Sequence, residues 1–291
     1  MKLVKLFVKD GSKFHFGQRK LNSTDIIFHN DSLFSAIMNN YVKLYGSTPQ
    51  KFPKISSVFY FSNNTLFFPR PFIELDIDME SKDIKKIKFI SEGVLEKINE
   101  KIEDFFINEE GFLYLDKEST PSIDKFMEPK AFIPRKSGDA TPFEMESFEI
   151  KNGGFYFFVD DLEDKKIIQA IHMIKNEGLG GERSSGKGLF DKIEISNYEF
   201  KEKGNRYFSL SLISPENDDF NKVVAYDIIQ RKGFIYSPFT EITYRKKPTY
   251  MLVEGSIFQE QVNGSIKKVA NAQGDLKHDV YRDGRAVMMR F

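Results

Sequence analysis

A glycine-rich loop between a predicted helix and a predicted strand constrains this chain most. The helix is predicted for residues 162–177, where apolar residues recur at helical spacing and Gly178 ends the pattern. The loop Gly-Gly-Glu-Arg-Ser-Ser-Gly-Lys-Gly spans residues 180–188, and an alternating strand is predicted for 189–200. Glycines allow backbone conformations that aim consecutive N–H groups at an anion, and Arg and Lys add charged donors. The loop therefore predicts a phosphodiester-binding site, with a plain flexible turn as the alternative.

The same loop almost matches the nucleotide-binding P-loop pattern GxxxxGK[ST], but it fails in two ways. Gly188 stands where the pattern requires a hydroxyl to hold magnesium. A P-loop also leads from a strand into a helix, whereas this loop leads from a helix into a strand. We therefore do not expect an ATPase.

Earlier segments complete a recognisable order of elements. A buried strand is predicted for residues 2–8, and a helix capped by Asn30 or Asp31 continues until Gly46. Two strands, 54–62 and 65–70, flank Asn63-Asn64, which suits a hairpin turn.

Downstream, residues 72–145 carry acidic stretches and four prolines, and they are predicted to form a projecting insertion. A second hairpin is predicted from residues 146–151 and 155–160. Without the insertion the order is β-α-β-β-α-β, which is the ferredoxin-like pattern. The sequence thus predicts a first domain over residues 1–200.

Residues 201–291 are predicted to form a second domain that is rich in strands. The strand signals lie at 207–213, 223–229, 234–236 and 250–258. No repeat of 20–50 residues stands out, but this domain could be a degenerate copy of the first. The predicted fold class is therefore α+β.

Composition excludes several classes of protein. The chain has no cysteine, so it has no disulfide, thiolate zinc site, iron–sulfur cluster or cysteine nucleophile. Its four histidines have no metal-ligand spacing, and we expect neither a metal nor a cofactor. No run of 18 apolar residues occurs, which excludes a transmembrane helix, and we expect a cytoplasmic protein. The 30 phenylalanines and absence of tryptophan favour an ordinary core over base-stacking surfaces.

The neutral net charge conceals an uneven distribution. Residues 1–71 hold ten Lys/Arg and three Asp, a net charge of +7, whereas residues 72–128 hold eight Lys/Arg and sixteen Asp/Glu, a net charge of −8. The basic segment could bind a polyanion while the acidic segment contacts a basic protein. Two solvated faces are the alternative.

Several motifs together resemble a known family. The helix–GLGGERSSGKG–strand segment resembles the glycine-rich loop of the RAMP superfamily of CRISPR proteins. The segments 13–17 and 27–36 resemble the N-terminus of the fourth subunit of the type III-A (Csm) effector complex, and 278–286 is similar to that family's C-terminal block. Residues 132–136 with 141–144 are similar to its thumb-like insertion, so the motifs span the whole chain.

The resemblance implies both a fold and a function. The fold would be tandem ferredoxin-like (RRM-like) domains, with a thumb-like insertion in the first. The protein would hold the repeat-derived 5′ handle of the crRNA and dock against the large signalling/nuclease subunit and a backbone RAMP subunit. It would do so without catalysing a reaction, inside an antiviral ribonucleoprotein.

The same resemblance assigns residues to RNA binding. Glycine-loop residues would cradle handle phosphates, namely Gly180, Gly181, Arg183, Ser184, Gly186, Lys187 and Gly188. His15 and Gly17, with His29 and Ser32 at the head of the first helix, would line the same groove. Free N–H groups at that helix N-terminus suit an anion. On the thumb, Arg135 and Phe132 would wedge between bases, or be a surface charge and a small-core residue.

A second hypothesis is a metal-independent endoribonuclease. Related RAMP proteins that process precursor crRNA use a histidine as general acid or base, so His15 or His29 could cleave RNA. In those nucleases the glycine loop lies near the C-terminus, whereas about a hundred residues follow it here. This difference favours binding without cleavage.

Overall fold

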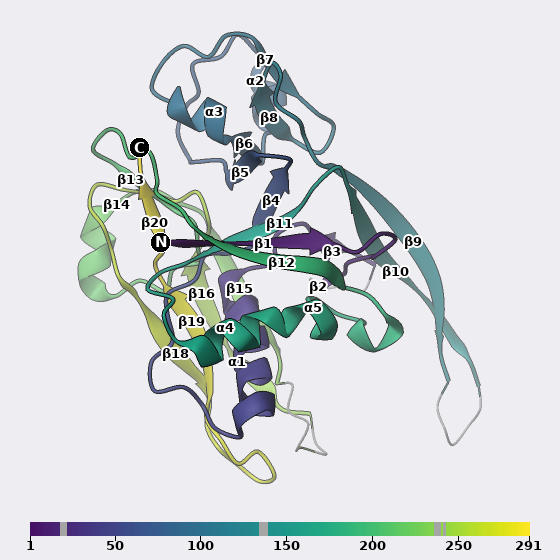
Figure 1. The fold of residues 1–291 in the computed structure, drawn as a ribbon. Helices are drawn as coiled ribbons and strands as arrows, with labels where there is room; N and C mark the ends of the chain where they lie inside the picture. The colour runs from purple at the N-terminus through teal and green to yellow at the C-terminus, as the bar shows by residue number, and fades with distance from the viewer. Residues whose placement is uncertain (18–21, 134–138, 236–239, 241–242) are drawn as a thin grey trace.

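A large, mostly antiparallel sheet with helices on one face organises the first two thirds of the chain (Figure 1). The computed structural model describes residues 1–17, 22–133, 139–235, 240 and 243–291. The strand order in the sheet is β12-β1-β11-β4-β5-β6-β8-β7. These strands are β1 (Lys2–Val8), β4 (Phe59–Ser62), β5 (Thr65–Pro69), β6 (Phe89–Ser91), β7 (Phe105–Ile107), β8 (Phe112–Leu115), β11 (Gly154–Val159) and β12 (Phe190–Asn197).

Four of these strands form the ferredoxin-like unit. In chain order they are β1, β4, β11 and β12, and their order in the sheet is fourth, first, third, second, with every neighbouring pair antiparallel. Helix α1 (Asn30–Tyr45) follows β1, and α4 (Lys165–His172) with α5 (Ile174–Glu177) follows β11. The predicted α+β class and β-α-β-β-α-β order are confirmed.

The two predicted helices are confirmed with small changes at their ends. The N-cap of α1 is His29 rather than Asn30 or Asp31, and Gly46 ends the helix in the left-handed conformation. The apolar stripe of the second helix is buried as expected, at Ile167, Ala170, Ile171 and Ile174. Asn40 Nδ2 of α1 donates to the carbonyl of Ala170 at 3.1 Å, so the helices pack side by side.

The first predicted hairpin is confirmed and the second is wrong. Strands β4 and β5 pair across Asn63-Asn64, and Asn63 has a φ of 50°. By contrast, β10 (Thr141–Lys151) pairs with β9 (Ser122–Phe132) along its whole length, and β11 instead lies between β1 and β4. All six residues of β11 are buried, and such a strand requires a neighbour on both edges.

The insertion between β5 and β11 has two parts. Its first part contains α2 (Ser81–Ile84) and α3 (Glu92–Glu96) and adds β6, β8 and β7 to the edge of the main sheet. Only its second part, the ribbon of β9 and β10, extends away from the body as a thumb (Figure 1). The prediction that the whole insertion projects is therefore wrong for the first part.

The C-terminal third is built almost entirely of strands. A four-stranded sheet has the order β14-β17-β13-β20, and two ribbons pair β15 with β16 and β18 with β19. Helical structure among its described residues is limited to the 3-10 helix η2 (Asn217–Lys222). Its strands are β13 (Tyr207–Ser209), β14 (Val223–Ala225), β15 (Ile228–Phe234), β16 (Arg245–Leu252), β17 (Ile257–Phe258), β18 (Gly264–Ala270), β19 (Val280–Arg285) and β20 (Met288–Arg290).

This unit has an antiparallel sheet, and no α-helix covers it among its described residues. All four predicted strand signals overlap observed strands, although Tyr236 lies outside the described residues.

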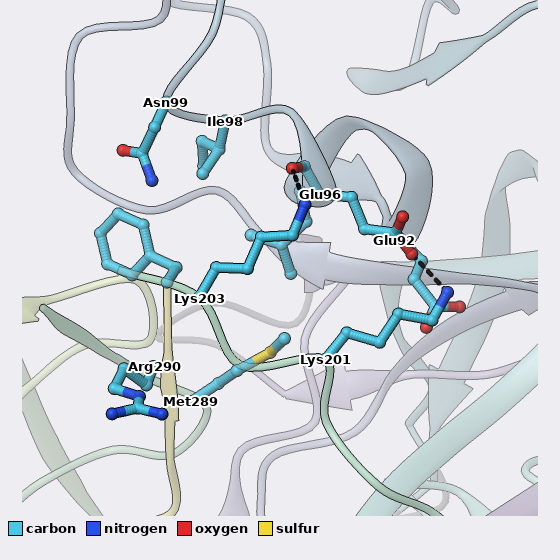
Figure 2. A pocket seen from close by; sticks show the side chains of 10 residues that line it. Glu92, Glu96, Ile98, Asn99, Lys201, Lys203, Met289 and Arg290 are labelled. Atoms are coloured by element: carbon cyan, nitrogen blue, oxygen red, sulfur yellow. Dashed lines mark hydrogen bonds and ion pairs between the residues drawn. The ribbon is translucent and has the colours of Figure 1, made fainter. Parts of the chain in front are cut away.

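One continuous core joins the two units. It is rich in phenylalanine, including Phe14, Phe155 and Phe208, which are at most 1% exposed. This burial confirms that phenylalanine mainly fills the core. Figure 2 shows a small hollow at the junction, where Lys201 Nζ lies 2.6 Å from a carboxylate oxygen of Glu96 on α3, close to β20. The hollow encloses only about 20 Å³, which is room for a single water and not for a nucleotide.

Candidate nucleic-acid interface

The glycine loop packs tightly against the N-terminal segment 13–17. The amide of Gly181 donates to the His15 carbonyl and that of Gly188 to the Lys13 carbonyl, both at 2.8 Å. A Cβ at Gly180 would lie 2.6 Å from the His15 carbonyl oxygen, and one at Gly188 would lie 2.1 Å from that of Leu179. These glycines therefore serve close backbone packing, a reason that the sequence pattern did not reveal.

The amides of the loop are largely used inside the protein. Those of Ser185 and Lys187 donate to the Glu182 carbonyl, and that of Gly186 donates to the Arg183 carbonyl. These N–H groups are thus not offered to a phosphate, contrary to the expectation that consecutive amides point outward. What the loop presents is its tip, where a 3-10 turn (Arg183–Ser185) carries the exposed Ser184 and precedes the exposed Gly186.

Lys187 is buried and joins the loop to the base of the thumb. Its side chain is 8% exposed, and its ammonium forms an ion pair with Glu128 of β9 and donates to Ser147 Oγ of β10 at 3.1 Å. Lys13 adds a second ion pair to Glu128 at 2.9 Å. The expectation that Lys187 offers an open ammonium to a phosphate therefore differs from the structure.

The environment of Glu128 shows how strongly this junction favours a charged carboxylate. Burial alone would raise the pKa of Glu128, but hydrogen bonds from Lys187, Lys13 and Ser147 lower it to about 2. Glu128 thus holds three separate parts of the chain together, namely the glycine loop, segment 13–17 and the thumb.

His15 and Gly17 lie beside the loop as expected. His15 is buried, and its Nδ1 donates to the Glu146 carbonyl of β10 at 2.7 Å. Gly17 is exposed in β2 (Phe16–Gly17), which pairs with β3 (Thr24–Asp25). The structure therefore brings the glycine loop, His15, Gly17 and the thumb base into one surface.

His29 and Ser32 lie elsewhere, under the C-terminal unit. His29 is buried, with its Nδ1 2.8 Å from Glu254 Oε1 and its Nε2 3.7 Å from Asp25 Oδ2. Burial alone would lower the pKa of His29, but the two carboxylates raise it to about 9. The imidazole is therefore a protonated tether between the two units, and the expectation that it lines the groove is wrong.

The head of α1 is likewise covered by cations of the C-terminal unit. Arg231 contacts both carboxylate oxygens of Asp31, at 3.0 and 2.8 Å, and donates to Ser32 Oγ at 3.0 Å. Arg282 adds a third guanidinium contact to Asp31 at 3.4 Å. This helix N-terminus is thus part of the junction between the units and not an open anion site.

Sequence reasoning missed the acidic partners of the site. Glu128 and Glu146 sit on the thumb strands, and Glu182 pairs with Lys130 at 2.6 Å. No local pattern in the sequence singled out these carboxylates. Of the predicted thumb contacts, Arg135 lies outside the described residues, and Phe132 is 63% exposed near the end of β9.

A second cleft lies away from the glycine loop. Between the end of α1 and the start of α4 lies a cleft of about 640 Å³, lined by the carboxylates of Asp161, Glu163 and Asp164 and by Lys51 and Lys166, so its charged lining has no positive surplus for a phosphate. No group of three or more metal-binding side chains occurs in the described part of the chain. Nor does any helix within the described residues have the length and apolar character to cross a membrane.

The fold and the thumb-linked glycine loop define a RAMP-type protein with ferredoxin-like architecture. Residues 202–291 match the family model described as the CRISPR Csm4 C-terminal domain. A Csm4 protein from Methanocaldococcus jannaschii is 30% identical, with 100% of this chain and 98% of the relative covered. The chain therefore belongs to the Csm4 family.

Further relatives agree with this assignment. A Csm4 protein from Streptococcus thermophilus is 24% identical over 91% of this chain and 92% of the relative. A chain in a crystal structure of a Csm3–Csm4 subcomplex of the type III-A CRISPR–Cas interference complex matches with a TM-score of 0.73 and 26% identity, covering 100% of this chain and 99% of that one. A chain from a Csm1–Csm4 cassette with pppApA matches in fold, with a TM-score of 0.60 at 18% identity, covering 99% and 96%.

Proposed function

We propose that this protein is the RNA-binding subunit that holds the repeat-derived 5′ handle of the crRNA in a type III-A effector complex. The observation that carries the proposal is the junction at Glu128, which fixes the glycine loop, segment 13–17 and the thumb in one arrangement. Contacts held in a fixed geometry recognise a splayed single strand without a further ordering cost.

The charges around this junction suit a phosphodiester backbone. Five cations, Lys13, Lys125, Lys130, Arg183 and Lys187, surround three carboxylates, Glu128, Glu146 and Glu182. This set holds two more positive than negative charges, and segment 13–17 belongs to the strongly basic stretch of residues 1–71. Arg183 and the hydroxyl of Ser184 would contact phosphates at the exposed tip, while Lys187 would maintain the loop.

The thumb supplies the apolar part of the interface. Phe132 and Ile133, 63% and 62% exposed, lie near its far end. Exposed apolar side chains on a rigid ribbon can insert between unpaired bases, and stacking of this kind is tolerant of sequence. The thumb would therefore set the path of the RNA rather than its sequence.

We further propose that the chain bridges two protein neighbours of the complex. Solved relatives are described as Csm3–Csm4 and Csm1–Csm4 assemblies, which supports contacts with a backbone RAMP subunit and with the large signalling/nuclease subunit. The extension of the sheet offers an acidic surface for a basic partner. Its exposed carboxylates are Glu74, Asp76, Asp78, Glu80, Glu100 and Glu103.

The proposal includes binding without cleavage. The two histidines considered for a nuclease are both at most 6% exposed. His29 holds a proton between two carboxylates, and His15 Nδ1 is engaged by a carbonyl. A general acid or base has to reach the substrate, and neither imidazole presents itself to solvent.

The test compares two variants in binding a fluorescent handle RNA at several salt concentrations. Arg183→Ala should weaken binding and reduce the slope of log K against log salt by about 0.7, the value for one phosphate contact on a single strand. The matched control is Lys192→Ala, which removes an exposed cation from β12 that is 61% exposed. Equal slopes for Arg183→Ala and the unmodified protein would remove the loop tip from the RNA site.

A further inference from the structure

The ribbon of β15 and β16 has an unusual charge composition. The sequences IIQRKGF and RKKPTYML contain five Lys/Arg and no Asp or Glu, in a chain whose net charge is zero. Apart from one bridge between Leu252 and Ile213, the ribbon pairs with no third strand in the described part of the chain. Its two faces have different surroundings.

Its inner face packs on the rest of the protein. Arg231 reaches Asp31 at the head of α1, and Met251 is 1% exposed. Met251 pairs with Ile229 across the ribbon, and Arg231 pairs with Thr249, so these residues share one face. This face is occupied by the junction between the two units.

The outer face carries aromatic rings beside cations. Tyr250 is 65% exposed and pairs with Gln230, whose Nε2 donates to the Tyr250 hydroxyl at 2.8 Å. Phe234 is 58% exposed and pairs with Arg245, whose guanidinium lies 5.3 Å from the ring centroid. Lys232 and Lys247 are exposed beside them.

We propose that the outer face of this ribbon binds single-stranded RNA as a second contact, separate from the glycine loop. Unpaired bases would stack on Tyr250 and Phe234, and phosphates would contact Lys232, Arg245 and Lys247. The inference rests on the proposed function, because it assumes that the chain is part of an RNA-containing complex.

The chemistry of this face favours RNA over a protein partner. Protein interfaces are depleted of lysine at their cores, whereas here lysines alternate with the exposed rings. Grooves for single-stranded nucleic acid combine aromatic platforms with cations in this way, and stacking on a ring requires an unpaired base. The absence of any carboxylate along both strands removes local repulsion of phosphates.

A run of direct contacts ties this face to the glycine loop. The loop bonds to His15, the next residues form β2, and β2 pairs with β3. Asp25 of β3 contacts His29, and two residues later Asp31 contacts Arg231 of the ribbon. The ribbon is therefore linked to the glycine loop through the head of α1.

The first experiment is ultraviolet crosslinking of the complex purified with its crRNA, followed by mass spectrometry of the crosslinked peptides. We expect crosslinks to Tyr250 or Phe234 as well as to peptides around the glycine loop. Crosslinks at the loop alone would overturn the ribbon site and leave the handle site standing. Crosslinks at the ribbon alone would support this inference and contradict the proposed handle site.

The second experiment uses variants of the full chain and the fluorescent RNA. Tyr250→Ala should weaken binding roughly 5- to 150-fold, the range for the loss of one stacked base, whereas Tyr250→Phe should retain it. A triple change of Lys232, Arg245 and Lys247 to alanine should reduce the salt slope by about 2. The matched control replaces with alanine three exposed lysines that are distant in sequence from the ribbon, Lys85, Lys97 and Lys165.

Two outcomes would refute the ribbon site. Unchanged RNA affinity and salt slope in both ribbon variants would exclude a contact with RNA. Unchanged RNA affinity together with loss of a co-purifying protein subunit would show that the face docks a protein instead. Circular dichroism of each variant confirms that the change is not a loss of folding.

Discussion

Replacing Glu128 by glutamine removes the carboxylate that joins the thumb to the glycine loop. Lys187, whose side chain is 8% exposed, would keep its charge and lose its counter-ion, retaining only Ser147 Oγ at 3.1 Å. Breaking a buried ion pair from one side costs about 3–5 kcal/mol, and the partial exposure of Glu128, at 23%, places this case at about 3 kcal/mol. For a chain of 291 residues the midpoint of thermal unfolding would fall by roughly 5 °C.

A double-mutant cycle separates this effect from a general loss of packing. Lys187→Met should cost only about 1 kcal/mol, because Glu128 keeps Lys13 at 2.9 Å and Ser147 at 2.8 Å. The double variant Glu128→Gln with Lys187→Met should be more stable than the sum of the two losses predicts, by about 2 kcal/mol. Urea unfolding followed by circular dichroism measures all four free energies. Additive losses, or a loss below 1 kcal/mol for Glu128→Gln, would refute the account of this junction.

Three further predictions concern other parts of the framework. The pKa of His29 is raised to about 9 from 6.5, so its contribution to stability is complete below pH 6.5 and is lost as the pH rises through 9. An NMR titration, in which the His29 signal is assigned by its absence in His29→Gln, should show that pKa. A pKa near 6.5 would contradict the role of His29 as a tether. Asp31→Asn would leave Arg231 and Arg282 without their carboxylate and should cost about 3 kcal/mol or more in urea unfolding. Gly188→Ala should destabilise the protein more than Gly186→Ala. Both glycines have a positive φ, but only at Gly188 would a Cβ lie 2.1 Å from a backbone oxygen. Equal midpoints of urea unfolding for the two variants would disprove the packing role of Gly188.

Local patterns predicted the elements of the fold well. The stripes of α1 and α4 and the hairpin at Asn63-Asn64 depend on residues near one another in sequence, and the structure confirms them. Whether β10 pairs with β9 or with β11 depends on residues that are distant in the sequence. Residues 146–151 pair with β9, and β11 is taken up between β1 and β4. The alternation of residues within a strand does not identify the neighbouring strand with which it pairs.

The same distinction applies to the site. The glycine loop, His15 and Gly17 were grouped from motifs that are close in the sequence or share a resemblance, and the structure places them side by side. His29 lies away from this group because its imidazole contacts Glu254. Glu254 is 225 positions away in the sequence, and no local pattern links the two residues. Lys187 likewise matches a phosphate-binding pattern, yet Glu128 of the thumb neutralises it. Charges in a linear motif identify candidates, and their long-range partners decide which remain available.

The central claim is that this chain holds the handle of a crRNA and does not cut it. The most direct test is to co-express the tagged chain with its genomic neighbours and a CRISPR array, purify it, and sequence the bound RNA. Cleavage of precursor RNA by the purified chain is measured in parallel, with and without EDTA. We predict mature guides that share one 5′ repeat handle and no cleavage by the chain alone. Cleavage of precursor RNA by the chain alone, lost on His15→Ala, would contradict the account and identify a processing nuclease.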